Sequence, residues 1–176
     1  VEPVVEDLKA FALAVPGKVA EKMDKLRVAD AMTDVFTLFK RLNKYIDETM
    51  PWALAKDEAK KDRLATVLYN LVEGITMGAT LLESFMPETT ERILAQLNAD
   101  KRTLEDLKTF GLYPSGNKVT DKPEILFARL DAKEIMPKID AIREAQKAEF
   151  EAEQKALGGL PETTEESGEA IDIEAK

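Results

Sequence analysis

The sequence turns a corner within Asn43-Lys44-Tyr45-Ile46-Asp47-Glu48-Thr49-Met50-Pro51-Trp52-Ala53-Leu54-Ala55-Lys56, a stretch that lies between two long amphipathic patterns. Pro51 lacks an amide hydrogen and disfavours an α conformation at Met50, so we expect one helix to end there. Because proline is favoured at the first position of a helix, a new helix is expected to begin at Pro51. Trp52, the only tryptophan, therefore lies at a helix–helix corner, where its ring can be held and still face outward.

The two patterns beside this corner predict long helices. Before the corner, apolar residues recur at alternating spacings of four and three, which places them on one helix face: Val28, Met32, Val35, Phe39, Leu42 and Ile46. After it, a similar series predicts a second face: Leu64, Leu68, Leu71, Ile75, Leu82 and Phe85. Gly74 and Gly78 interrupt the second helix one turn apart, and each costs about 1 kcal/mol relative to alanine. Close approach of a neighbouring helix would offset that cost.

Shorter patterns extend the helical prediction in both directions. Residues 5–26 are expected to form a helix that breaks or kinks at Pro16-Gly17, and residues 88–97 a shorter helix. Thr103, followed by acids, is typical of a helix N-cap. Residues 125–130 are expected to be extended and laid back against the bundle, and a last helix begins near Asp131.

These elements predict an all-α protein, an antiparallel helix bundle over residues 1–146. The methionines and phenylalanines at helical spacing are expected in its core. Residues 147–176 are predicted to hold the helix end and then an acidic linker or disordered tail. They carry nine acids and three bases, and from Gly158 onward they are rich in Gly, Pro, Thr, Glu and Ser.

Composition excludes several classes of chemistry. The chain has no cysteine and no histidine, which removes thiolate catalysis, the usual general base and the commonest ligands of zinc. The three serines have no histidine to activate them, and Gly158-Gly159 lacks the lysine and threonine of a phosphate-binding loop. We therefore predict no catalytic residue and no metal site. With no signal peptide and no apolar run near the roughly 20 residues that span a bilayer, we expect a cytoplasmic protein without a membrane partner.

The net charge of −9 argues against bulk electrostatic binding of nucleic acid, and we expect no DNA partner. Between Lys40 and Arg63, however, seven bases face five acids, so the corner is locally positive. By physical chemistry alone, Trp52 is either a packed corner residue or a platform on which an unstacked RNA base can stack. In the second case, nearby lysines are candidate phosphate contacts: Lys44, Lys56, Lys60 and Lys61.

Several short motifs surround the corner: Asn43 to Thr49, Pro51-Trp52, Leu54 to Asp57, Leu68 to Glu73, Phe85 to Thr89, Gly111, Pro114, Gly116, Lys118-Val119, Lys122-Pro123, Leu126-Phe127 and Arg129 to Asp131. Together they resemble the C-terminal anticodon-binding domain of methionyl-tRNA synthetase, a class I synthetase, over about residues 25–140. The Pro-Trp corner and the Phe-Met-Pro-Glu-Thr turn are the specific parts of this resemblance. Two alternatives stay open: a helical protein–protein interaction module with a buried Trp52, and the anticodon domain of another class I synthetase, such as the cysteine or valine enzyme.

The resemblance implies a function for the corner. Trp52 would be the residue against which the cytosine of the CAU anticodon of tRNA(Met) is read, Pro51 would set the corner, and Asn43 is a further candidate. The family's opening helix, with an Asn-x-x-x-Arg element, would precede Val1. The catalytic region, with its ATP, magnesium and zinc, would lie further upstream, so this chain is expected to be a fragment without a cofactor. Residues 169–173 resemble the linker to a further tRNA-binding domain through which the full-length enzyme would form a homodimer.

Overall fold

The computed structural model describes residues 2–156, and the chain divides into two units between Phe127 and Ala128. The first unit contains the helices α1 (Pro3–Asp24), α2 (Val28–Thr49), α3 (Pro51–Leu54), α4 (Lys61–Leu82) and α5 (Pro87–Leu97), with two 3₁₀ turns, η1 (Glu58–Lys60) and η2 (Asp106–Lys108). The second contains α6 (Ala132–Ala156). No strand occurs between residues 2 and 156, and the all-α prediction is confirmed.

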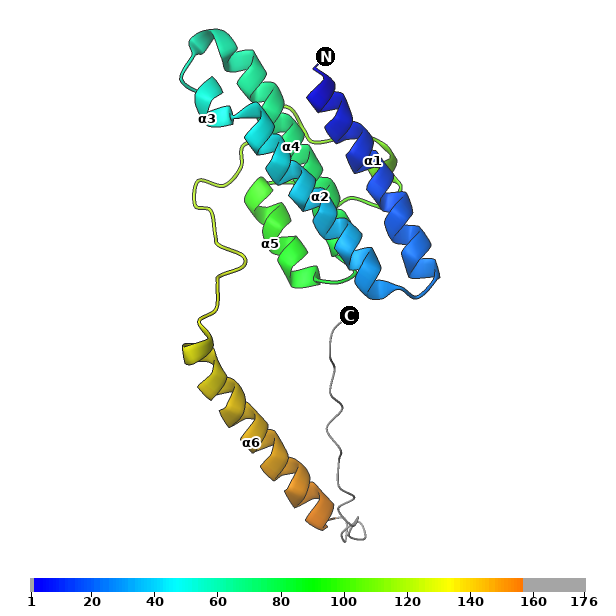
Figure 1. The fold of residues 1–176 in the computed structure, drawn as a ribbon, viewed down its shortest axis with the longest axis vertical. Coiled ribbons are helices and arrows are strands. Elements are labelled where there is room, and N and C mark those ends of the chain that lie inside the picture. The colour runs from blue at the N-terminus through cyan, green and yellow to red at the C-terminus, as the bar shows by residue number, and fades with distance from the viewer. Residues whose placement is uncertain (1, 157–176) are drawn as a thin grey trace, which may run out of the picture. The chain divides into compact units, whose positions relative to one another are not determined.

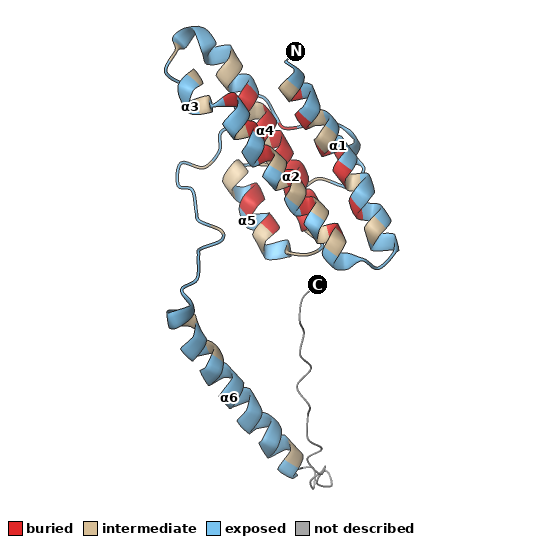
Figure 2. Ribbon diagram, viewed as in Figure 1, coloured by how far each residue is buried: buried red, intermediate tan, exposed pale blue. Residues whose placement is uncertain are grey.

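The helices of the first unit form an antiparallel bundle. Figure 1 shows α1, α2 and α4 running alternately up and down, with the shorter α5 beside them. Helix α2 packs against both α1 and α4, and α5 packs against α4. The buried residues lie on the faces that these helices turn toward one another, as the red segments in Figure 2 show.

The buried face of α2 differs from the predicted one. The residues that are buried are Ala31, Val35, Leu38, Leu42, Tyr45 and Thr49, whereas Val28 is exposed and Phe39 and Ile46 are only partly buried. Only Val35 and Leu42 belong to both sets. The prediction was wrong because it assigned the buried face from large apolar side chains alone. A helix that packs between two neighbouring helices also buries small residues such as Ala31 and the ring of Tyr45.

Helix α4 is the centre of the bundle. Every residue from Glu73 to Leu82 except Ile75 is buried, while Leu68, predicted for the core face, is exposed. The predicted close approach at the two glycines is confirmed. A Cβ atom on Gly74 would lie 2.6 Å from Cδ2 of Leu42, and one on Gly78 would lie 2.7 Å from Cζ of Phe39. The absence of a side chain at Gly74 and at Gly78 thus makes room for the side chains of Leu42 and Phe39 on α2.

The stretch Glu58–Leu82 is long and apolar enough to cross a membrane by length and composition, which the sequence pattern did not predict. In the bundle, however, 61% of its most apolar window is buried. Burial of this kind is what the core helix of a globular domain shows, so the apolar composition of α4 is explained by its central position.

The other sequence predictions had mixed outcomes. The helix α5 and the start of α6 are confirmed. Of the break or kink predicted at Pro16-Gly17, the break is wrong, because α1 continues through Pro16 with buried residues on both sides of it. Leu126 packs against the core, and Phe127, although 58% exposed, lines a pocket with residues of the bundle, whereas Ile125 is 80% exposed. The prediction that this apolar run lies back against the bundle was therefore wrong for Ile125. The boundary predicted at residues 146 and 147 falls inside α6, and the predicted tail lies outside the described residues.

Candidate nucleic-acid interface

The corner after α2 forms as its sequence predicts. Helix α2 ends at Thr49, and Met50 adopts a left-handed conformation with φ 45° and ψ 62°. Pro51 then opens α3, a single turn closed by the amide of Ala53, which donates to the carbonyl oxygen of Met50 at 2.8 Å. Leu54, at the end of this turn, packs against the core and holds the corner on the bundle.

Trp52 lies on the outer side of this corner, where 54% of its surface is exposed. A tryptophan used for packing buries most of its area, so the packing alternative does not describe this side chain. Met50 is similarly exposed, at 49%. The corner therefore presents apolar surface to solvent on a backbone fixed by a proline and by helix hydrogen bonds.

The candidate phosphate contacts differ in their surroundings. Lys44 lies 3.6 Å from a carboxylate oxygen of Glu48, and Lys60 lies 3.3 Å from Asp57, which also caps η1 through its bond from the amide of Ala59. Lys61 is 3.9 Å from Glu58. Lys56 has no carboxylate within 4.0 Å among residues 2–156. Among these four lysines, Lys56 is therefore the one whose positive charge is least neutralised by a neighbouring carboxylate.

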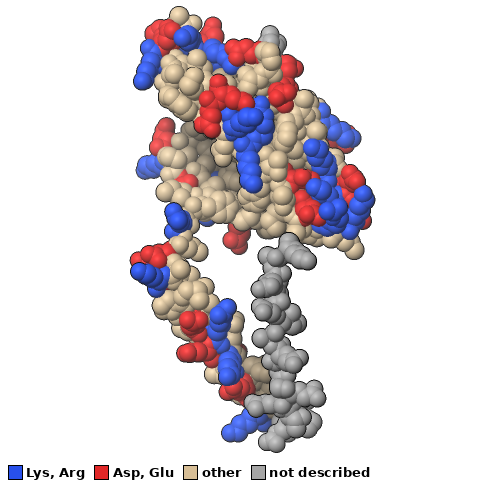
Figure 3. Space-filling view, viewed as in Figure 1, with Lys and Arg blue, Asp and Glu red and all other residues tan. Residues whose placement is uncertain are grey.

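The wider surface around the corner carries both signs of charge. In Figure 3, blue and red side chains alternate over the visible face of the bundle, without a large field of one sign. Arg41 on α2 is typical, because its guanidinium lies 3.0 Å from Glu48 and 3.9 Å from Asp7. A ligand held here would depend on local contacts more than on long-range attraction.

Asn43 lies elsewhere along α2. It is six residues, or about 9 Å along the helix axis, before the end of α2. Its side chain lines a largely apolar pocket of 480 Å³ between α2, α4, α5 and residues 124–127, together with Phe36, Phe39 and Ile46. Asn43 thus belongs to the wall of this pocket, and Trp52 does not line it.

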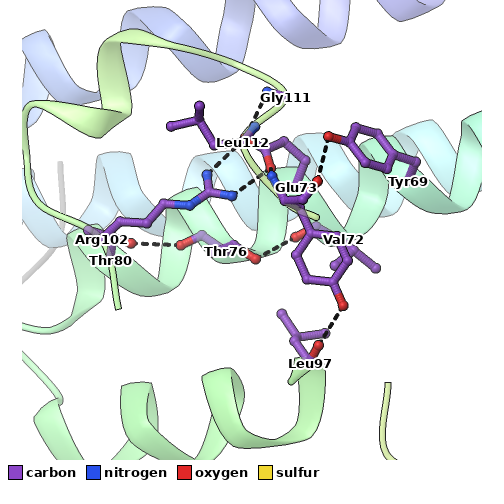
Figure 4. Close-up of polar contacts among 10 residues, drawn as sticks. Tyr69, Val72, Glu73, Thr76, Thr80, Leu97, Arg102, Gly111 and Leu112 are labelled. Carbon is purple, nitrogen blue, oxygen red and sulfur yellow. Dashed lines mark hydrogen bonds and ion pairs between the residues drawn. The ribbon is translucent and has the colours of Figure 1, made fainter. Parts of the chain in front are cut away.

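A second polar feature, which the sequence analysis missed, is a buried ion pair. Glu73 on α4 is fully buried, and both of its carboxylate oxygens accept hydrogen bonds from the guanidinium of Arg102, at 2.8 and 2.7 Å (Figure 4). The backbone amides of Gly111, Leu112 and Tyr113 also donate to this carboxylate, at 2.9, 3.2 and 2.8 Å. These residues, Glu73, Arg102 and 111–113, are called the Glu73 anchor below.

The anchor keeps its carboxylate charged. Burial by itself raises the pKa of the Glu73 carboxyl, but the hydrogen bonds from Arg102 and the backbone, together with the positive charge of Arg102, outweigh it and hold that pKa below its ordinary value. Burial and the nearby charge of Glu73 raise the pKa of the Tyr69 hydroxyl, which donates to the carbonyl oxygen of Tyr113. The anchor therefore fixes the irregular segment after η2 onto α4.

Two residues of the irregular segment after η2, Gly111 and Tyr113, let its backbone reach the carboxylate of Glu73. Gly111 has φ +104°, a conformation that side chains rarely adopt, and this lets three successive amides turn toward one carboxylate. The hydroxyl of Tyr113 donates to the carbonyl oxygen of Leu97 at the end of α5. The signal that could have revealed the anchor is a single acid, Glu73, inside the apolar run of the core helix.

The described residues offer little for metal or acid–base chemistry. Between residues 2 and 156 no group of three or more acids is placed to hold a metal ion, and the chain has no histidine or cysteine. Asp106 is an exposed acid that accepts bonds from the amide and hydroxyl of Thr103, and these bonds lower its pKa.

Comparison with known proteins agrees with this geometry. Residues 6–147 match the family model described as the anticodon binding domain of methionyl tRNA ligase. The methionine–tRNA ligase of Clostridium perfringens is 44% identical over 144 residues, covering 82% of this chain and 22% of that protein. The ligase of Clostridium acetobutylicum is 40% identical over 172 residues, covering 98% of this chain and 26% of that protein. The chain thus spans about a quarter of the length of these relatives.

Solved structures show the same fold. The free form of the Mycobacterium tuberculosis methionyl-tRNA synthetase superposes with a TM-score of 0.65 at 24% identity, covering 74% of this chain and 27% of that one. The same synthetase in complex with methionyl-adenylate gives a TM-score of 0.65 at 25% identity, covering 73% of this chain and 26% of that one.

Proposed function

The chain belongs to the family of the anticodon-binding domain of methionyl-tRNA ligase, and from this premise we propose that it binds the CAU anticodon loop of tRNA(Met). Within the longer ligase this binding would position the tRNA for ATP-dependent aminoacylation by a catalytic region that the chain does not span. ATP, magnesium and zinc would bind in that region, and the ligase would work in the cytoplasm without a DNA or membrane partner. A homodimer of the full-length enzyme would form through a further C-terminal domain.

The observation that carries the proposal is the exposure of Trp52 on a fixed corner. The residue is 54% exposed, and Pro51 and the capped end of α2 hold the backbone beneath it. RNA proteins recognise loop bases by stacking them on such rings, and we assign Trp52 to the first anticodon base, the cytosine. A stack of this kind contributes about 1–3 kcal/mol, or roughly a 5-fold to 150-fold change in the dissociation constant.

Lys56 is our first choice for the phosphate contact. It follows Trp52 by four residues and has no carboxylate within 4.0 Å among the described residues, whereas Lys44 and Lys60 each face an acid. A lysine that already pairs with a carboxylate must break that pair before it binds a phosphate, which lowers the free energy gained on binding. Lys44 and Lys60 are therefore secondary contacts, and Asn43, in the pocket wall, acts by bracing α2.

The test uses the intrinsic fluorescence of Trp52, the only tryptophan. We expect a CAU stem-loop to quench this emission at low salt, and a stem-loop with a changed anticodon to do so only at much higher concentration. Trp52→Ala, followed with a labelled RNA, should weaken binding of the CAU loop by roughly 5-fold to 150-fold. Unchanged emission with both RNAs, up to several hundred micromolar, would contradict direct stacking. A preference for a non-CAU loop would favour another class I synthetase.

A salt titration tests the role of Lys56. Removing one phosphate contact lowers the slope of log K against log salt by about 0.7 for single-stranded RNA. Lys56→Gln should show this reduction, while Lys61→Gln, which removes an exposed lysine that pairs with Glu58, should leave the slope near that of the wild type. Equal slopes for Lys56→Gln and wild type would remove Lys56 from the interface.

A further inference from the structure

We propose that Met50 is an oxidation site that controls RNA binding at the Trp52 corner, which is defined as residues 49–54. A hydroperoxide converts its thioether to a sulfoxide and thereby weakens binding, and reduction of the sulfoxide restores it. The proposal rests on the proposed function, because it takes the corner to be the surface that holds the anticodon loop.

The six methionines of the chain differ widely in exposure. Met50 is the most exposed of them, at 49%, followed by Met136 at 46% and Met23 at 36%. The other three are partly buried or, like Met77, fully buried in the core. Because a peroxide must reach the sulfur atom to oxidise it, Met50 is among the first methionines to react.

Hydrogen bonds on both sides of Met50 fix its backbone beside Trp52. Its amide donates to the carbonyl oxygen of Ile46 at 2.9 Å, and its own carbonyl oxygen accepts from the amides of Ala53 and Leu54 at 2.8 and 3.2 Å. One residue separates Met50 from Trp52, so their Cα atoms lie within about 7 Å of each other. A nucleotide held on the ring of Trp52 is therefore within reach of the long Met50 side chain.

The backbone conformation of Met50 makes its side chain informative. Among residues 2–156, three residues other than glycine have positive φ: Leu26 in the turn between α1 and α2, Met50, and Asn98 after α5. Helix ends in this conformation favour glycine or asparagine, which tolerate it at lower steric cost. Methionine offers what neither of them does, a flexible apolar group whose polarisable sulfur packs well against aromatic rings. At this position it supplies an apolar contact to a nucleotide held at Trp52.

Oxidation replaces this apolar contact with a polar group. Hydrogen peroxide transfers one oxygen atom to the thioether sulfur, so the sulfur is oxidised to the sulfoxide and the peroxide is reduced to water. The sulfoxide oxygen accepts hydrogen bonds from water in the free chain and loses them where RNA covers it, which opposes binding. A methionine sulfoxide reductase reverses the change, because two thiols reduce the sulfoxide to the thioether and form a disulfide and water.

The test compares the wild type with Met50→Leu, which keeps an apolar side chain of similar size but has no sulfur at this position. Both chains are treated with hydrogen peroxide, the sulfoxide at each methionine is quantified by mass spectrometry, and binding of a labelled CAU stem-loop is measured before and after treatment. We expect oxidation to weaken binding by about 5-fold or more in the wild type and by less than about 2-fold in Met50→Leu. Treatment with the reductase should restore binding by the wild type, which irreversible damage to Trp52 would not allow.

A matched control is Met136→Leu, which removes the methionine of similar exposure on α6 and should lose binding on oxidation as the wild type does. Two outcomes would overturn the proposal alone: equal weakening of the wild type and Met50→Leu by peroxide, or unchanged binding by a wild type in which Met50 is fully oxidised. A Met50 that reacts no faster than the buried Met77 would also overturn it. Failure of the untreated wild type to bind the loop would contradict the proposed function, and this proposal with it.

Discussion

The Glu73 anchor and the Trp52 corner use the same backbone device, a residue in the left-handed region, for opposite purposes. At the anchor, Gly111 adopts φ +104° and turns its amide toward a buried carboxylate. At the corner, Met50 adopts φ 45° and turns the chain so that Trp52 faces solvent. No buried side-chain nitrogen or oxygen of the anchor lacks a hydrogen-bond partner, while the corner leaves apolar surface open. The anchor therefore serves stability, while the corner offers the exposed surface to which the proposed function assigns binding.

The largest expected effect is a loss of unfolding free energy when the Glu73 anchor is broken. Glu73→Gln would leave the guanidinium of Arg102 buried without its counter-charge, and breaking a buried pair in this way costs about 3–5 kcal/mol. Urea unfolding followed by circular dichroism would measure the loss. As a matched control, Glu105→Gln removes a similar pair, to Lys108, that is exposed, and should cost less than about 1 kcal/mol. Equal losses in the two variants would mean that the anchor holds no more of the fold than a surface pair does.

The anchor also predicts how stability changes with acid. The pKa of Glu73 is lower in the folded than in the unfolded state, so its stabilisation is fully present above the unfolded pKa of about 4.3 and is lost as pH falls through the folded value. The difference in unfolding free energy between wild type and Glu73→Gln should therefore be constant near neutral pH and shrink below about pH 4.3. A difference that stays constant to about pH 3 would show that Glu73 is not the charged partner of Arg102.

The two regions also differ in how far the sequence could predict them. The corner follows from local rules, because Pro51 fixes both the end of one helix and the start of the next. The anchor depends on Arg102 and residues 111–113 meeting α4 from 29 to 40 residues away, which no local pattern encodes. The same limit explains α2, where the buried face was set by its contacts with α1 and α4 rather than by its largest apolar residues.

The smallest expected effect concerns the left-handed backbone of Met50, and it tests whether this strained conformation contributes to RNA binding. Met50 adopts a left-handed conformation that costs a side-chain-bearing residue about 1–2 kcal/mol, whereas glycine adopts it freely but loses about 0.5–1 kcal/mol more backbone entropy on folding. Met50→Gly should therefore raise the unfolding free energy by about 0.5–1 kcal/mol, and Leu26→Gly, at the other strained turn, should do the same. If the conformation of Met50 only sets the corner, Met50→Gly will bind the CAU stem-loop within 2-fold of the wild type. A variant that is more stable but binds clearly more weakly would show that the methionine side chain contacts the RNA beside Trp52, which would make the strain part of the binding site.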